Sequence, residues 1–285
     1  MLSSPFNYTG SKSKLTNQLI NYLPENHKHL YCYDLFCGGG GFFINTMSEF
    51  KGLIANDIIT PLIQFYQWLQ DTEWDIVISV IRSTNISKDD QQGYLDLRKR
   101  FNDEKNFIDF FILVCCCTNN MMRFNKSYGF NQTWGKRNFN QSTENKLRAY
   151  HAKIFENPCI HFLNKSFIDF IDIETGPKSF VYLDPPYLIT EAGYNAYWSQ
   201  ELENKLYLYI NELNKNGIPF MLSNVQRHKG KKNTCISNLL QYNIIELNFD
   251  YKKVSRDKNN QDSQEVIVIN YEPSLKQNKM DWMND

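Results

Sequence analysis

The sequence predicts an α/β fold in which a largely parallel sheet is flanked by helices and interrupted by a mainly helical insert. Two observations predict it. Residues 30–57 follow the order strand, glycine turn, helix, strand and acid, which opens a doubly wound α/β domain. Strand character then disappears and first returns at residues 159–163 and 180–183. The expected parts are residues 1–57 and 157–271 for the sheet, 58–156 for the insert, and 272–285 for a polar tail.

The first part of the sheet domain is expected to hold two helices and two strands. Residues 11–23 are expected to be helical, because a serine can cap the segment and leucines recur on one face. Residues 30–36 are typical of a buried strand, which the glycine run 38–41 ends before a helix that starts at Phe42. Residues 52–56 form the second expected strand.

The insert carries helical periodicity over residues 61–117, where several short helices are expected. Residues 118–137 are polar, basic and aromatic and contain two turn glycines, so they form a hairpin or an irregular loop. A helix over residues 143–155 follows, with Ser142 as its cap.

The second part of the sheet domain begins with strands at 159–163 and 180–183. A helix is expected over residues 200–216, closed by Gly217. The remaining expected elements are a strand over 218–222 with a turn at Ser223 and Asn224, and strands over 244–249 and 265–271.

Composition excludes several classes of protein. The chain has 285 residues, of which 42% are hydrophobic, so a wholly disordered chain is excluded. No apolar run reaches the roughly 18 residues of a membrane span, and no secretory signal is recognisable. The seven cysteines and five histidines lack the spacing of a metal site, and the odd cysteine count does not suggest a disulfide framework. The sequence therefore predicts a soluble cytoplasmic protein that binds no metal.

Charge is balanced overall, with 31 basic and 31 acidic residues, but it is segregated along the chain. Residues 120–165 hold eight basic residues and two acids, and residues 225–258 hold eight basic residues and three acids. Residues 164–203 hold seven acids and two lysines. One interpretation is an ordinary solvated surface. The other is a polyanion-binding face beside a site that uses carboxylates.

A glycine run after one strand and an acid after the next predict a nucleoside-type ligand. Glycines let the backbone approach a ligand closely, and the start of the following helix offers free N–H groups. The run lacks the GxGxxG spacing of a dinucleotide site. Asp57 is placed to accept hydrogen bonds from a ribose diol. The candidate residues are Asp34, Phe36, Gly38, Gly39 and Asp57.

A second motif, Asp184-Pro185-Pro186-Tyr187, follows an apolar strand. The two prolines fix the backbone, so the Asp184 carboxylate and the Pro185 carbonyl can both face a pocket. Tyr187 offers a flat apolar face with a polar tip. Two acceptors and a stacking plane suit an amino group on an aromatic ring. A weaker third candidate lies in residues 6–12, where Tyr8 could stack on a ligand and Lys12 could reach an anion or a base edge.

These motifs, read together, resemble the Dam-type DNA adenine-N6 methyltransferases (D12 class, alpha group), most nearly the phage-encoded enzymes. The matching segments are YTGSK, DLFCGGGGFF, ND and YLDPPYLIT, in that order, with a basic insert before DPPY. The resemblance spans about residues 6–271. It implies a Rossmann-like class I methyltransferase sheet, with residues 58–156 as a DNA-recognition domain. It also implies transfer of a methyl group from S-adenosylmethionine to adenine N6 in double-stranded DNA, within GATC, after base flipping.

The resemblance also implies roles for particular residues. Tyr8 and Lys12 would contact or flank the methyl donor, and Asp34 with the glycine turn would hold its methionine part. Asp57 would bind its ribose. The remaining implied roles are catalytic: Asp184 and the Pro185 carbonyl would accept hydrogen bonds from the adenine amino group, and Tyr187 would stack on the flipped base.

The recognition loop of the family is matched by residues 123–137. Arg137 is the leading candidate for a guanine edge, because a guanidinium matches O6 and N7 as a bidentate fork. Met121 and Arg123 could insert beside the flipped base. Thr133 and Trp134 stand where the family usually has proline and Phe or Tyr. The full set of expected DNA contacts is Lys12, Met121, Arg123, Asn125, Asn131, Lys136 and Arg137.

The expected partner is double-stranded DNA, bound by a monomer or a weak dimer in a bacterial or phage-infected cytosol. Two alternatives stay open. An RNA adenine methyltransferase would use the same fold, and a catalytically silent DNA-binding protein would keep the fold without turnover.

Overall fold

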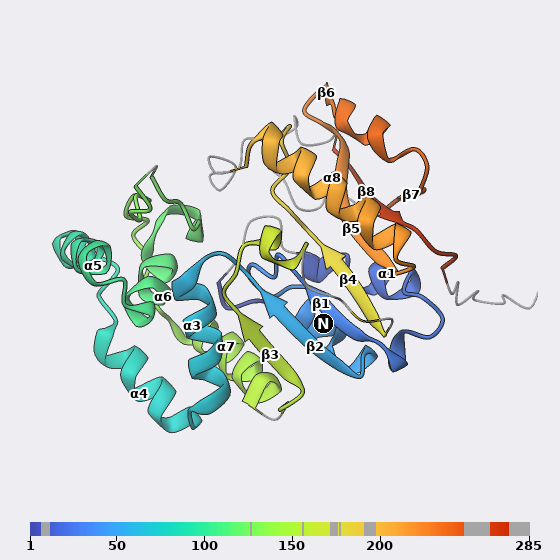
Figure 1. The fold of residues 1–285 in the computed structure, drawn as a ribbon. Helices are drawn as coiled ribbons and strands as arrows, with labels where there is room; N and C mark the ends of the chain where they lie inside the picture. Colours follow the sequence, from blue (N-terminus) through green and yellow to red (C-terminus); the bar gives the residue numbers. More distant parts are fainter. Residues whose placement is uncertain are drawn as a thin grey trace, which may run out of the picture.

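The protein was analysed as a computed structural model, which describes residues 1–6, 12–125, 127–155, 157–171, 176, 178–190, 198–247 and 263–273. Its centre is one sheet with the strand order β3-β2-β1-β4-β5-β8-β7, and β6 pairs with β5 outside this path (Figure 1). The strands are β1 (Tyr31–Asp34), β2 (Gly52–Asn56), β3 (Ile160–Leu163), β4 (Ser179–Leu183), β5 (Phe220–His228), β6 (Lys231–Lys232), β7 (Asn243–Glu246) and β8 (Gln264–Ile269).

The direction of the strands sets the place of a ligand. Strands β3, β2, β1, β4 and β5 pair in parallel, and β8 pairs antiparallel with β5 and β7. The strand order reverses between β1 and β4, and ligands of open α/β sheets bind beyond the carboxyl ends of the strands at such a point. Asp34 ends β1, and Asp184 follows β4 directly. The fold therefore brings the two motifs together.

Helices cover both faces of this sheet. The sheet domain holds α1 (Thr16–Asn21), α2 (Phe43–Thr46) and α8 (Gln200–Lys215). Alternate residues of β4 face opposite ways: Val181 and Leu183 belong to a core with α8, whereas Phe180 and Tyr182 belong to the larger core on the other face. The expected α/β sheet is confirmed.

The insert is helical, as expected, with α3 (Thr60–Asp71), α4 (Trp74–Thr84), α5 (Gln91–Glu104), α6 (Phe107–Cys116) and α7 (Gln141–Phe155). In Figure 1 these helices lie beside the β3 edge of the sheet. Tyr66 on α3 and Tyr150 on α7 pack at ring distances of 5.4 and 6.1 Å from Phe43 on α2. The insert and the glycine-turn side of the sheet thus share one hydrophobic core.

The loop between α6 and α7 folds back on itself like a hairpin. Isolated antiparallel β-bridges pair Cys117 with Trp134 and Phe124 with Phe130. The expectation that Ser142 caps the next helix is wrong. The helix begins at Gln141, and the Asn140 side chain accepts the hydrogen bond from the Thr143 N–H.

The expected end of the strand at residue 222 is also wrong. Ser223 and Asn224 lie within β5, because they pair with Ile267 and Val266 of β8. Both polar residues are buried yet bonded: the Ser223 and Tyr182 hydroxyls lie 2.9 Å apart, and Asn224 Oδ1 accepts from Asn233 Nδ2. Among the described residues, no helix is both long and apolar enough to cross a membrane.

Candidate functional site

A cavity of about 1060 Å³ opens beyond the carboxyl ends of the parallel strands. Residues from the glycine turn, from the motif after β4 and from the insert line the same space. Of the expected site residues, it is lined by Lys12, Asp34, Phe36, Gly38, Gly39, Asp57, Met121, Asp184, Pro185 and Tyr187. Expected residues Arg123, Asn125, Asn131, Lys136 and Arg137 are not among its lining, and Tyr8 lies outside the described residues.

The glycine turn needs its glycines. Gly38 and Gly40 adopt φ angles of 45° and 75°, which side chains disfavour. A Cβ added at Gly40 would lie 1.9 Å from the Tyr150 hydroxyl. The Tyr66 hydroxyl donates to the Gly38 carbonyl at 2.8 Å, and the Tyr150 hydroxyl reaches the Gly39 carbonyl at 3.5 Å. Two tyrosines of the insert therefore hold the turn that lines the cavity.

Asp57 braces the same turn from the other side. Its Oδ2 accepts from the Gly38 N–H and its Oδ1 from the Ile59 N–H, each at 2.9 Å. Burial raises the pKa of this carboxyl, and the backbone N–H groups partly oppose that effect. The second lone pair on each carboxylate oxygen can still accept a hydrogen bond from a ligand.

Asp34 is the least satisfied polar group of the cavity. Its side chain is fully buried, and neither carboxylate oxygen has a hydrogen-bond partner among the described residues. Burial raises its pKa well above the ordinary value and the charges of Asp184 and Asp57 add to the rise, whereas the backbone N–H of Phe36, too poorly placed for a regular hydrogen bond, partly opposes it. A buried carboxylate with so little hydrogen bonding is costly, because it loses its hydration and gains little in return. A bound cation or hydrogen-bond donor at this point would remove that cost.

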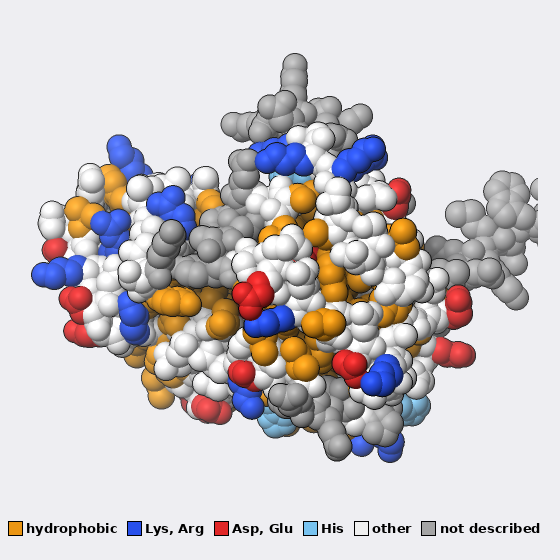
Figure 2. Space-filling view, turned by 45° about the horizontal axis from the view of Figure 1, so that its top comes forward, with side chains coloured by type: hydrophobic (Ala, Val, Ile, Leu, Met, Phe, Trp, Pro, Cys, Tyr) orange, Lys and Arg blue, Asp and Glu red, His pale blue; other side chains and the backbone are white. Residues whose placement is uncertain are grey.

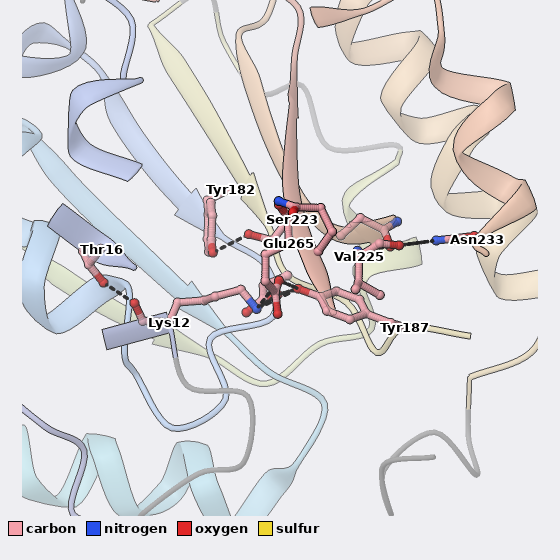
Figure 3. A network of polar contacts seen from close by, with 11 residues as sticks. Lys12, Thr16, Tyr182, Tyr187, Ser223, Val225, Asn233 and Glu265 are labelled. Atoms are coloured by element: carbon pink, nitrogen blue, oxygen red, sulfur yellow. Dashed lines mark hydrogen bonds and ion pairs between the residues drawn. The ribbon is translucent and has the colours of Figure 1, made fainter. Parts of the chain in front are cut away.

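Asp184 belongs to a polar network with Lys12 and Tyr187, both of which are labelled in Figure 3. Lys12 Nζ lies 3.0 Å from its Oδ1, and the Tyr187 hydroxyl donates to the same oxygen at 2.9 Å. The described residues place no hydrogen bond on Oδ2 of Asp184. One oxygen is thus oriented by the protein, and the other is left to accept a hydrogen bond from a molecule in the cavity.

Glu265, on β8, completes this network. Its Oε2 lies 3.8 Å from Lys12 Nζ and accepts from the Tyr187 hydroxyl at 3.4 Å. Burial together with the charges of Asp184 and Glu265 raises the pKa of Tyr187 well above its usual range, so the phenol keeps its proton at neutral pH. Sequence reasoning missed Glu265. Its only signal was an acid at the start of an otherwise apolar strand.

The cavity also has an aromatic wall, of which the sequence predicted one residue, Phe36. Phe36, Phe167 and Trp198 line the cavity, with ring centroids 5.4 to 5.7 Å apart. The Trp198 indole donates to Glu203 at 2.6 Å, which fixes the orientation of the ring. Such a wall suits the flat face of a purine.

The expected recognition loop forms its own internal contacts. The Arg123 guanidinium donates to the side chain and the carbonyl of Asn131, at 3.0 and 2.9 Å. Arg137 donates to the side chain of Asn120. Asn125 Oδ1 accepts from the N–H groups of Ser127 and Gly129, and Lys136 lies 5.8 Å over the Trp134 ring. The loop is held in shape by the polar side chains that were expected to read DNA.

S-adenosylmethionine fits the residues present. It carries an ammonium group, a ribose diol and a purine, and the cavity offers the partnerless Asp34 carboxylate, Asp57 and the aromatic wall. No group of three His, Cys, Asp or Glu side chains in the described part of the chain could hold a metal ion.

Comparisons with known proteins agree with this geometry. Residues 8–265 match the family described as D12 class N6 adenine-specific DNA methyltransferase. The chain is 32% identical over 286 aligned residues to the modification methylase StsI of Streptococcus sanguinis, covering 95% of this chain and 43% of that protein. It is 31% identical to the type II methyltransferase M.FokI of Planomicrobium okeanokoites, again over 95% of this chain and 43% of that protein. The chain thus spans less than half the length of these relatives.

Among solved structures, the rRNA methyltransferase aviRa from Streptomyces viridochromogenes matches with a TM-score of 0.41 and 10% sequence identity. That match covers 94% of this chain and 93% of the other.

Proposed function

The chain belongs to the D12 class of N6 adenine-specific DNA methyltransferases, and we propose that it methylates the N6 amino group of adenine in double-stranded DNA. One observation carries the proposal. Asp184, with its Oδ2 left without a hydrogen bond by the described residues, opens into the same cavity as the partnerless Asp34 carboxylate and the glycine turn.

The chemistry follows from the poor nucleophilicity of adenine N6, whose lone pair is delocalised into the ring. The Asp184 carboxylate and the Pro185 carbonyl would each accept one hydrogen bond from the amino group. These two hydrogen bonds would localise the lone pair on the nitrogen. S-adenosylmethionine supplies the methyl group as an electrophile. The Asp184 charge also stabilises the positive charge that grows on N6, and positioning and electrostatics provide most of the rate.

The donor would be held by residues of both motifs. Asp34 would accept hydrogen bonds from its ammonium group, and the glycine turn would pack along its methionine part with Phe36 beside it. Asp57 would accept from the ribose diol through lone pairs that the backbone does not use. Lys12 and Tyr8 would flank this site from the segment before α1.

Base flipping is part of the proposal. A base in a duplex cannot reach a buried carboxylate, so the target adenine must leave the stack. Tyr187 would stack on the flipped base. Met121 and Phe124, which line the insert side of the cavity, are apolar groups that suit the gap left in the duplex.

Target choice would come from the hairpin-like loop of the insert. Arg137 would read a guanine edge, with Arg123, Asn125, Asn131 and Lys136 at neighbouring bases or phosphates. We propose GATC as the target and an alpha-group, Dam-like arrangement, since the insert lies between the glycine turn and DPPY. A role as a modification methylase is consistent with the names of the relatives. We also propose that the protein acts in the cytosol, as a monomer or a weak dimer on DNA.

Mapping N6-methyladenine tests this function. The chain is expressed in bacterial cells that lack adenine methylation, and their DNA is sequenced with a method that detects the base. We expect methylation within one short sequence in the wild type and none with Asp184→Ala. Methylation at another sequence would replace GATC but keep the reaction. Donor binding without methylated DNA would favour a silent DNA-binding protein, and methylated RNA alone would favour an RNA methyltransferase.

A further inference from the structure

Strands β5 and β6 end in an exposed hairpin that carries an unusual density of positive charge. Its turn, Lys229–Gly230, has two positive φ angles, 50° and 78°, as in the tight turns that suit strand twist. Arg227, Lys229, Lys231 and Lys232 are all exposed on it. We call these four residues the cationic hairpin.

The pairing of the strands places like charges opposite each other. Arg227 is the direct partner of Lys232, and His228 is the partner of Lys231. Like charges at directly opposite positions destabilise a strand pair. Within the described part of the chain, no acidic side chain forms an ion pair with Arg227, Lys229 or Lys232. A polyanion bound at the hairpin would offset the repulsion between the paired Arg227 and Lys232.

The hairpin is nevertheless held firmly to the sheet. Asn233, which is buried, donates from Nδ2 to Asn224 Oδ1 and to the Val225 carbonyl, each at 3.0 Å (Figure 3). Its own N–H donates to the Gln226 carbonyl at 2.9 Å. The backbone that carries the positive charges is thus fixed, so little backbone conformational entropy is lost when they bind an anion.

The position of the hairpin relates it to the proposed site. His228 and Lys229 line one wall of the catalytic cavity, and Met121, Phe124 and Tyr128 of the insert line another. Figure 2 shows groups of Lys and Arg side chains both over the insert and over the β5–β6 end of the sheet. Lys105 at the end of α5 also lines the cavity, so basic residues from the hairpin and from the insert, which are distant in sequence, contribute to the same space.

We propose that the cationic hairpin is a second DNA contact, which binds backbone phosphates beside the flipped adenine while the insert loop reads the bases. This inference rests on the proposed function. The hairpin carries lysines rather than aromatic or amide side chains at its turn, so it suits a sequence-independent contact with phosphates rather than readout of base edges. Neutralising phosphates with lysines releases counterions, which makes the contribution of the hairpin strongly dependent on salt.

The test is the salt dependence of DNA binding. The variant Lys229→Gln/Lys231→Gln/Lys232→Gln is compared with the wild type on a duplex that contains the mapped target and on one that lacks it. The slope of log Kd against log salt is expected to fall by about two to three, since each phosphate contact contributes about 0.9. The single variant Lys229→Gln should lower it by about one. Both duplexes should lose affinity by the same factor, roughly tenfold or more for the triple variant at low salt.

A matched control variant replaces three lysines at the amino ends of the strands, which is the end of the sheet away from the cavity. Lys28, Lys51 and Lys178 are exposed and precede β1, β2 and β4, at the amino ends of the strands. Their replacement by Gln should leave the slope unchanged. The melting temperatures of both triple variants check that they are folded.

The outcomes separate the two proposals. A wild type that methylates DNA, with an unchanged slope in the hairpin variant or an equal fall in the control, overturns the hairpin contact alone. An affinity loss confined to the target duplex also overturns it, since it would make the hairpin a base reader. A wild type that neither binds nor methylates DNA removes the proposed function itself.

Discussion

Lys12 Nζ lies 3.0 Å from Asp184 Oδ1 and donates to the Tyr187 hydroxyl at 2.7 Å, so one ammonium orients both functional side chains of the motif after β4. The side chain of Lys12 is only 6% exposed. A buried ion pair is held together because either charge alone would be costly to bury. Asp184 is therefore positioned by Lys12, which lies near the N-terminus and is distant from Asp184 in sequence.

Replacing Lys12 with Gln should lower kcat by roughly 100-fold or more, the usual effect of losing one donor at a charged site. Without the ammonium, Asp184 and Glu265 face each other with no cation between them, and Asp184 loses its fixed orientation. Single-turnover methylation of a target duplex measures the effect. Glu265→Gln is the variant for comparison. It keeps the Lys12–Asp184 contact and should lower kcat clearly less than Lys12→Gln does. Equal losses for the two variants would contradict a special role for the Lys12–Asp184 pair.

Two variants of Tyr187 separate its ring from its hydroxyl. Tyr187→Phe removes the donor to the Asp184 carboxylate but keeps the aromatic face, and we expect a loss of roughly 10- to 100-fold, in line with one hydrogen bond to a charged group. Tyr187→Ala removes both and should cost at least 10-fold more, because stacking on a flipped base contributes about 1–3 kcal/mol. Rates on duplex DNA and on a duplex with a mismatched, already unpaired target adenine are compared. Stacking is refuted if the two variants behave alike on both substrates.

Tyr66→Phe tests how far the insert controls the glycine turn. The change leaves the buried Gly38 carbonyl without its 2.8 Å hydrogen bond, which should lower the free energy of unfolding by about 1–3 kcal/mol. Donor affinity should fall as well, since Gly38 lines the cavity. Urea unfolding and calorimetric titration with S-adenosylhomocysteine measure the two effects. Tyr150→Phe is the control, because its contact with Gly39 is long, at 3.5 Å, and its loss should matter less.

Local signals in the sequence predicted several of the residues that line the cavity, namely those in motifs that directly follow a strand. Strand β2 has its predicted bounds, because Gly52 and the acid after Asn56 mark both ends. The glycine turn and the motif around Asp184 were found because each follows an apolar strand, and the topology of a parallel sheet then brings such strand ends together.

The rest depends on partners distant in the chain. Strand β5 extends past Leu222 because β8 pairs with it, which no local pattern of Ser223 and Asn224 reveals. The sequence singled out neither Tyr66 nor Glu265, and only their long-range hydrogen bonds to Gly38 and Tyr187 relate them to the site. Arg123 was expected to insert beside a flipped base, and only the structure shows that its guanidinium is bonded to Asn131 within its own loop.

Asp34→Asn should make the free protein more stable and weaken its hold on the donor. The substitution replaces a buried carboxylate, which has no partner among the described residues, with a neutral group of the same shape. Because the pKa of Asp34 is raised in the folded state, the wild type loses stability as pH rises from the ordinary value of 3.8 toward that raised pKa. The stability difference between the variant and the wild type should therefore be smallest in acid, grow through that window and then level off. Urea unfolding at a series of pH values measures this difference.

The affinity for the donor should fall in Asp34→Asn, whereas the stability of the free protein should rise. Loss of the charge-assisted contact with the ammonium group is expected to weaken S-adenosylhomocysteine by roughly 10- to 100-fold, as for one hydrogen bond to a charged group. The stabilisation that a saturating ligand gives should shrink accordingly, because it depends on the ratio of ligand concentration to Kd. Asp57→Asn is a suitable comparison, since Asp57 already accepts two backbone N–H groups and its replacement should destabilise the free protein. If Asp34→Asn lowered stability at neutral pH and bound the ligand as tightly as the wild type, Asp34 would be a structural residue, and the donor would have to lie elsewhere in the cavity.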